Sequence, residues 1–155
     1  MKNRSPIRLI KGITALAVWS IIGLGLARAQ TTDPDMTATI PFTFTVANTT
    51  LPAGKYIIKR VDDNDPQALE LQSADGRATV AFLTESAQAN STPSKSELVF
   101  SKYGNRYFLK EILSEGDQTG NQVEMSRTER KLEKDGATRE RHSVECHRGK
   151  QHAKS

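Results

Sequence analysis

The chain has 155 residues, enough for one small hydrophobic core, with 22 Lys and Arg residues against 18 Asp and Glu residues. Five of the basic residues and none of the acidic ones lie in residues 1–29, so the remainder has 17 basic against 18 acidic residues, a formal net charge of −1. The basic balance of the whole chain is therefore no indication of nucleic-acid binding, and the single cysteine, Cys146, excludes an intramolecular disulfide.

Residues 1–29 have the features of a secretion signal. A positively charged start precedes an apolar run over residues 13–26, and Ala27 and Ala29 are small residues at the two positions that signal peptidase reads. We therefore expect cleavage between Ala29 and Gln30 and export to the periplasm or the extracellular space. A retained membrane anchor is the alternative, but the apolar run is shorter than the roughly 20 residues that span a bilayer.

After a polar leader over residues 30–36, the sequence predicts a β domain over residues 37–120. Apolar and polar residues alternate there with the period of half-buried strands, and turn-forming residues such as Asp75-Gly76 separate the alternating segments. The six predicted strands cover residues 40–46, 56–61, 68–72, 78–84, 98–103 and 107–113. The pattern indicates a mainly β fold, a small antiparallel β-sandwich or barrel of about six strands.

One face of each predicted strand supplies the expected core. The inward-facing residues are predicted to be Phe42, Phe44, Val46, Tyr56, Ile58, Leu69, Leu71, Val80, Phe82, Leu98, Phe100, Tyr107 and Leu109.

The C-terminal part of the chain has a different pattern. A short helix is predicted over residues 121–136, because Ser126 and Glu129 fit a capping box and Gly136 is a typical helix stop. Residues 137–155 are polar and charged without periodicity, so they are predicted to be a basic, disordered tail.

Several of these segments occur together in one known family. Ile40-Pro41-Phe42-x-Phe44-x-Val46, Leu51-Pro52-Ala53-Gly54-x-Tyr56, Ser73-Ala74-Asp75-Gly76, and Leu98-Val99-Phe100-x-x-Tyr103-Gly104 with Tyr107-Phe108-Leu109 follow in that order. Residues 40–113 thereby resemble a family of uncharacterised exported bacterial β-rich proteins. The resemblance implies a β fold and export, and it implies no catalytic residues; residues 137–155 are longer and more basic than is usual in that family.

Two small groups of residues are candidate sites. Tyr103, Tyr107 and Phe108 lie beside a turn, where aromatic rings present flat surface to a sugar or a partner; core packing is the alternative for at least two of them. His142, Cys146 and His147 are types that bind zinc or copper, and on a helix the first and second would share a face. A disordered tail gives them no rigid frame, so no metal site and no cofactor are predicted.

The sequence favours a non-catalytic binding or structural module of the cell envelope. All three histidines lie in the predicted tail, so the strand domain has no histidine base for a nucleophile and no enzyme activity is predicted. The alternatives are a metal-handling protein that uses the tail and a small envelope enzyme that uses the strand carboxylates Glu70, Glu85, Glu97 and Glu111. The partners expected for the basic tail are a cell-surface polymer, an anionic membrane surface or an envelope protein, but no nucleic acid, because acidic residues are interleaved with the basic ones.

Overall fold

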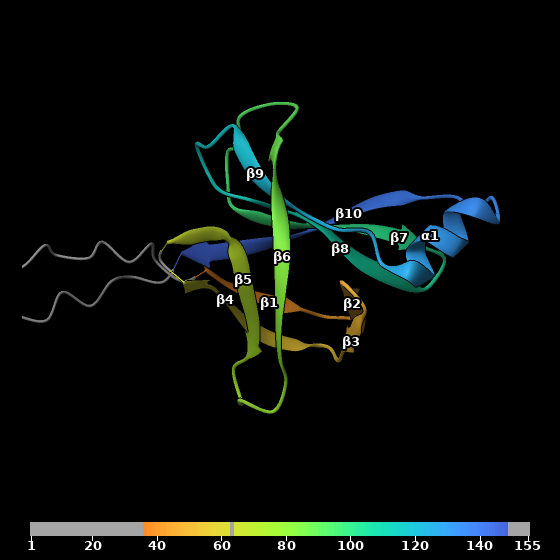
Figure 1. Cartoon of the computed structure of the whole chain (residues 1–155), viewed down its shortest axis with the longest axis horizontal. Coiled ribbons are helices and arrows are strands. Elements are labelled where there is room, and N and C mark those ends of the chain that lie inside the picture. Colours follow the sequence, from red (N-terminus) through yellow and green to blue (C-terminus); the bar gives the residue numbers. More distant parts are fainter. Residues whose placement is uncertain (1–35, 63, 149–155) are drawn as a thin grey trace, which may run out of the picture. The chain divides into compact units, whose positions relative to one another are not determined.

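The computed structural model describes residues 36–62 and 64–148, which form a mainly β structure with one short helix (Figure 1). The elements are β1 (Met36–Ile40), β2 (Phe44–Val46), β3 (Thr49–Leu51), β4 (Gly54–Asp62), β5 (Asp65–Ser73), β6 (Thr79–Gln88), β7 (Glu97–Tyr103), β8 (Arg106–Leu113), β9 (Thr119–Val123), α1 (Arg127–Lys134) and β10 (Glu140–Arg148). The predicted mainly β class is confirmed, and the described residues hold ten strands where the sequence predicted six.

Eight of these strands close into an antiparallel barrel in the order β1, β4, β5, β6, β9, β8, β7 and β10. β10 completes the ring by pairing with β1. The strands therefore form one closed ring rather than two separate sheets. The sandwich alternative is corrected by this closure. Because β10 pairs with both β1 and β7, neither of these two strands is left as an open edge.

β2 and β3 form a small hairpin outside the ring. β2 pairs in parallel with the first half of β8, whereas β9 pairs with the second half, so two strands share one edge of β8. The predicted strand over residues 40–46 is therefore divided between β1 and β2. Pro41 follows β1 directly and has no N–H to donate, which explains why the ladder breaks there.

The barrel interior is filled mainly by apolar side chains. All thirteen residues predicted to face inward belong to this core or pack against it. The core also contains residues that the six-strand prediction left out, namely Ala38, Ile40, Leu51, Ile112, Val123 and Cys146. The side-chain alternation of the central strands was thus a sound guide to the interior.

β10 contradicts the prediction of a disordered tail over residues 137–155. On its inward face, Val144 and Cys146 pack with the core, and Cys146 is 5% exposed. Its outward face carries Arg141 and Glu145, which are paired with opposite charges: Arg141 lies 2.7 Å from Glu97, and Glu145 lies 2.9 Å from Lys95. The polar and charged composition of the segment hid the strand in the sequence, and residues 149–155 lie outside the described part.

Residues 119–123 correct a second boundary, because they form β9 rather than the end of a loop and the start of the helix. Gly120 lies where β9 passes β8: a Cβ atom there would stand 2.5 Å from a methyl carbon of Leu113 and 3.2 Å from the carbonyl oxygen of Ile112. The strand can approach β8 at this point because glycine has no side chain.

The short helix is confirmed in its predicted place, as α1. The hydroxyl of Ser126 accepts a hydrogen bond from the backbone N–H of Glu129 (3.0 Å), and Gly136 ends the helix with a φ of 77°. Across residues 36–62 and 64–148, no helix has both the length and the apolar content to cross a membrane.

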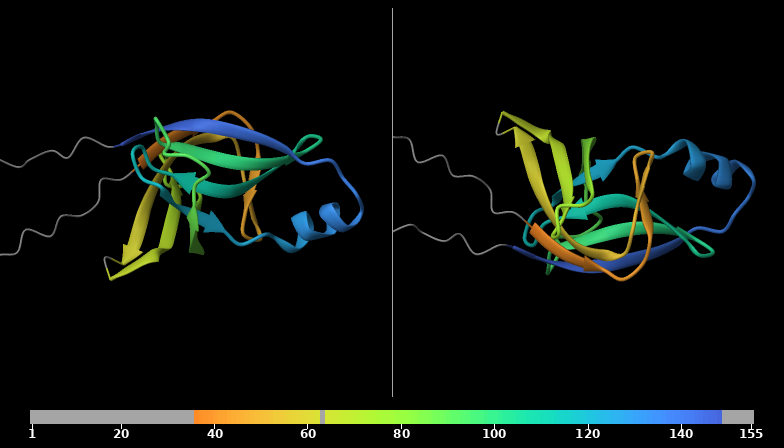
Figure 2. Two further views of the ribbon diagram at one scale, coloured as in Figure 1. Left: turned by 90° about the horizontal axis from the view of Figure 1, so that it is seen from above. Right: turned by 90° about the horizontal axis from the view of Figure 1, so that it is seen from below.

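The two ends of the barrel differ. At one end, the rings of Phe42 and Tyr107 stack with their centroids 3.8 Å apart, and the edge of His142 contacts both rings. At the other end, β1 begins and β10 finishes, with Met36 paired to Arg148. α1 and this second end lie on opposite sides of the barrel (Figure 2). We call the second end, where the candidate site lies, the open end.

Candidate binding site at the open end of the barrel

The inward-facing side chains change from apolar to polar toward the open end. β4 shows the change over three alternate positions, from Tyr56 and Ile58, which are buried, to Arg60, which is exposed. Three other strands also place a polar residue at an inward position near this end, namely Ser86 on β6, Thr119 on β9 and Arg148 on β10. The packed interior therefore ends in a ring of polar groups.

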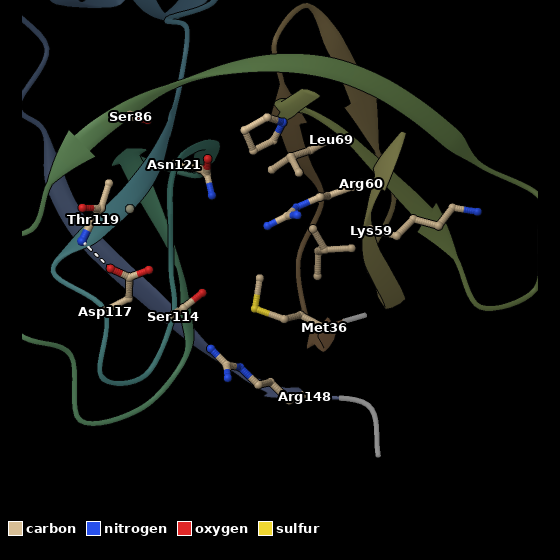
Figure 3. A pocket seen from close by; sticks show the side chains of 13 residues that line it. Met36, Lys59, Arg60, Leu69, Ser86, Ser114, Asp117, Thr119, Asn121 and Arg148 are labelled. Atoms are coloured by element: carbon tan, nitrogen blue, oxygen red, sulfur yellow. Dashed lines mark hydrogen bonds between the residues drawn. The ribbon is translucent and has the colours of Figure 1, made fainter. Parts of the chain in front are cut away.

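A cavity of about 350 Å³ lies inside this ring (Figure 3). It is lined by Met36, Ile58, Lys59, Arg60, Pro66, Leu69, Ser86, Ser114, Asp117, Thr119, Gly120, Asn121 and Arg148. These residues come from six strands of the barrel and from the loop between β8 and β9, so most of the wall is built on hydrogen-bonded strands. The volume is at the lower end of the range typical of small-molecule sites.

The floor of the cavity is apolar. Ile58 and Leu69 are 2% and 6% exposed and belong to the core, and the side chain of Met36 points into the cavity from β1 (Figure 3). An apolar group placed against these three side chains would be removed from water without displacing a charged group.

Positive charge predominates on the rim. The guanidinium group of Arg60 points toward the middle of the cavity and that of Arg148 lies along its lower edge (Figure 3). Lys59 also lines the cavity, but its ammonium group lies 3.0 Å from Glu70. Among the described residues of the lining, Asp117 is the one acidic residue, and one of its carboxylate oxygens accepts the N–H of Thr119 at 2.8 Å.

Asn121 adds a neutral donor to the lining. The side-chain oxygen of Asn121 lies 3.2 Å from the hydroxyl of Thr84, which is itself 3.0 Å from the carbonyl oxygen of Gln67. This contact ties the amide to β6, and the amide nitrogen faces the cavity (Figure 3). The site therefore offers donors from three strands above an apolar floor.

The aromatic residues proposed from the sequence do not form an exposed surface. Tyr103 and Phe108 are 4% and 2% exposed, and their rings pack edge to face with centroids 5.9 Å apart. Tyr107 is half-buried in its stack with Phe42. The expected exposure is wrong for Tyr103 and Phe108, which pack on the outer face of β7 and β8, while Tyr107 closes one end of the barrel. A ligand-binding role for these three residues stays a prediction.

The residues proposed as metal ligands are also held apart. His142 and Cys146 lie on one strand rather than a helix and are four positions apart, roughly 13 Å along β10. His147 lies on the opposite face, and burial raises the pKa of the Cys146 thiol to about 12. Within the described ranges, no three His, Cys, Asp or Glu residues are grouped so that they could hold a metal ion.

Among the described residues, each strand carboxylate proposed for the enzyme alternative has a cation nearby, except Glu85. The distances are 3.0 Å for Glu70 and Lys59, 2.7 Å for Glu97 and Arg141, and 3.4 Å for Glu111 and Lys110. Glu97 and Glu111 line a shallow polar cavity of about 400 Å³. The fold thus brings two of the four carboxylates to one hollow.

The basic residues after position 126 fall into groups with different surroundings. Its exposed face carries four cations at helical spacing, which with Asp135 line a hollow of about 260 Å³: Arg127, Arg130, Lys131 and Lys134. We call these four residues the α1 basic face. Arg139 and Arg141 instead pair with Glu133 and Glu97, and Arg148 belongs to the open end.

The opposite face of α1 rests on the barrel through an acidic side chain. Glu129 is 4% exposed, and its burial raises the pKa of the carboxyl group; Glu133 acts in the same direction, while Ser101, Arg139 and Lys110 oppose it. The pKa of the Tyr103 hydroxyl is also raised, by burial first and then by Glu129. The docking of α1 thus places a carboxyl group in a poorly hydrated setting.

Sequence reasoning missed Arg60 and Arg148 as site residues, because each lies in a charged stretch that reads as a solvated surface. The available signal was the alternation itself: counting in steps of two from Tyr56 reaches Arg60, and from Val144 reaches Arg148. Comparison with known proteins adds no assignment, since no protein-family model, curated protein or solved structure matches this chain. The resemblance to exported bacterial β-rich proteins stays a prediction.

Proposed function

We propose that this protein is a non-catalytic binding module that holds a small molecule in the open end of its barrel. The observation that carries the proposal is the cavity itself, with its buried apolar floor and its ring of inward polar side chains. An eight-stranded barrel has an interior just wide enough to be filled by side chains or to hold one small ligand. Here side chains fill most of the interior, and the unfilled part opens at one end.

The way in which the cavity is built supports binding. Its floor residues belong to the core, and Asn121 is fixed by Thr84, so the groups that would meet a ligand are held before it arrives. Preorganised groups lose little conformational entropy when a ligand binds. A site of this kind needs no lid and no rearrangement of the strands.

Export to the cell envelope is part of the same proposal. It is supported by the positive start, the apolar run and the Ala27-x-Ala29 sequence ahead of Gln30. We propose that residues 30–155 act in the periplasm or outside the cell. Cys146, the one cysteine, is buried in the barrel, so the fold is held by packing and hydrogen bonds rather than by a disulfide.

Native mass spectrometry of the protein purified gently from its own cell envelope tests this proposal. We expect a retained small mass in the wild type and in Leu83→Trp, which changes an exposed side chain on the outer face of β6. Ser86→Trp, on the inner face of the same strand, should fill the cavity and release that mass. A bare wild-type protein would contradict the binding function, and a mass retained by Ser86→Trp would place the ligand elsewhere.

The α1 basic face supports a second candidate function, contact with an anionic partner of the cell envelope. Its four cations lie within two turns of one helix, and a partner bound by charge alone would be released as salt rises. Changing Lys131 and Lys134 together to Gln should abolish salt-sensitive retention on an anionic polymer such as heparin. The matched control is Lys55 with Arg77, two exposed cations away from the helix; equal retention of both double variants would refute this candidate.

A further inference from the structure

Resting on the proposed function, we infer that the ligand of the open end is a small amphipathic anion: a carboxylate or phosphate head on a short apolar chain. The head would lie between Arg60 and Arg148, and the chain against Met36, Ile58 and Leu69. The inference joins two features of one cavity, its cationic rim and its apolar floor.

Strand register brings the two arginines to the same end of the barrel. Met36 on β1 pairs with Arg148 on one side and with Ile58 on the other, and Arg60 is the next inward position after Ile58. β4, β1 and β10 are adjacent, so the Cα atoms of the two arginines are two strand spacings and two residues apart, about 12 Å. Their long side chains reach the cavity from both sides of Met36 (Figure 3).

Guanidinium groups select an anionic head over a neutral polar one. The guanidinium group is always charged and presents paired N–H donors that match the oxygens of a carboxylate or phosphate. The NH₂ group of Asn121 points into the same space and can donate a further bond (Figure 3). Asp117, on the opposite wall, repels an anion, so it directs the head toward Arg60.

The floor selects for an apolar chain. Ile58 and Leu69 offer only carbon, and Met36 adds a thioether, so a polar chain there would lose its hydrogen bonds to water without replacement. Each CH₂ group buried on such a surface strengthens binding about fourfold. The cavity of about 350 Å³ limits the ligand to a small one.

Isothermal titration of the purified protein with octanoate, octanol and acetate tests the inference. Octanoate should bind one to one and at least tenfold more tightly than octanol, while acetate, which lacks the chain, should bind far more weakly than either. Arg60→Gln and Arg148→Gln should each weaken octanoate binding at least tenfold and leave octanol binding unchanged. Arg77→Gln, an exposed arginine of the β5–β6 hairpin, should change neither, and circular dichroism should show that all three variants are folded.

The outcomes separate this inference from the proposed function. Equal binding of octanoate and octanol, both blocked by Ser86→Trp, would overturn the anionic head and leave the binding function standing. Octanoate binding that survives both arginine substitutions would overturn the assignment of Arg60 and Arg148. No binding of either eight-carbon probe would overturn the ligand class, while the retained mass in the native spectrum decides the binding function independently.

Discussion

Removing β10 should unfold the protein, although the sequence alone marks this segment as a dispensable tail. A chain that stops after Gly136 lacks the strand between β1 and β7, whereas a chain that stops after Arg148 keeps it. β10 is paired at six positions with β7 and at three with β1, about nine ladder hydrogen bonds. At 0.5–1.5 kcal/mol each, their loss removes about 5–14 kcal/mol.

That loss is comparable to the whole stability of a small domain, about 5–15 kcal/mol. The shorter chain also leaves the edges of β1 and β7 unpaired and exposes the core where Val144 and Cys146 packed. Urea unfolding followed by circular dichroism should show a cooperative transition for the chain ending at Arg148 and none for the chain ending at Gly136. A cooperative transition at an unchanged midpoint for the shorter chain would refute the closed barrel.

Three further predictions concern single residues. Gly120→Ala should destabilise the protein by about 1–3 kcal/mol in urea unfolding, because the new Cβ would displace the buried Leu113 side chain and stand 3.2 Å from the backbone oxygen of Ile112; an unchanged midpoint would show that the strands have room. Glu129→Gln should raise the melting temperature at pH 7 but not at pH 4. The pKa of the Glu129 carboxyl group is raised in the folded state, so the wild-type protein loses stability as the pH rises above the unfolded-state pKa of about 4.5, and the glutamine variant does not. Equal shifts in melting temperature at both pH values would contradict this cost of burying the carboxylate. In the folded protein at pH 8, Cys146 should not react with a thiol-modifying reagent such as an aromatic disulfide, whereas in urea it should react with one equivalent. Rapid reaction of the folded protein would contradict the burial of Cys146.

The strands with apolar residues on one face could be predicted from the sequence, and the reason is physical. In the segments around Phe44, Leu71 and Phe100, burial of one strand face requires an apolar side chain at every second position, and this alternation can be read directly from the amino-acid sequence. The helix could be predicted as well, since Ser126 and Gly136 carry local signals at its two ends.

The remaining strands depend on partners that are distant in the chain. The charged residues Arg141 and Glu140 of β10 pair with Glu97 and Lys102 on the adjacent strand. These partners are distant in the sequence, so no local pattern near residue 141 predicts the pairing. The candidate site is hidden for the same reason. Arg60 and Arg148 are 88 positions apart, and only the register of β1 with its two neighbours brings them to one cavity.

The pairing of β1 with β10 sets the order in which the protein can acquire its structure. The first and last strands of the described chain are neighbours, so a chain that emerges N-terminus first from a ribosome or a translocation channel cannot close the ring until residue 148 is free. Until then, β1 has only β4 beside it and β7 only β8. Completion of the ring in a single late step leaves two strand edges exposed until then, and chaperones or other chains can bind these edges.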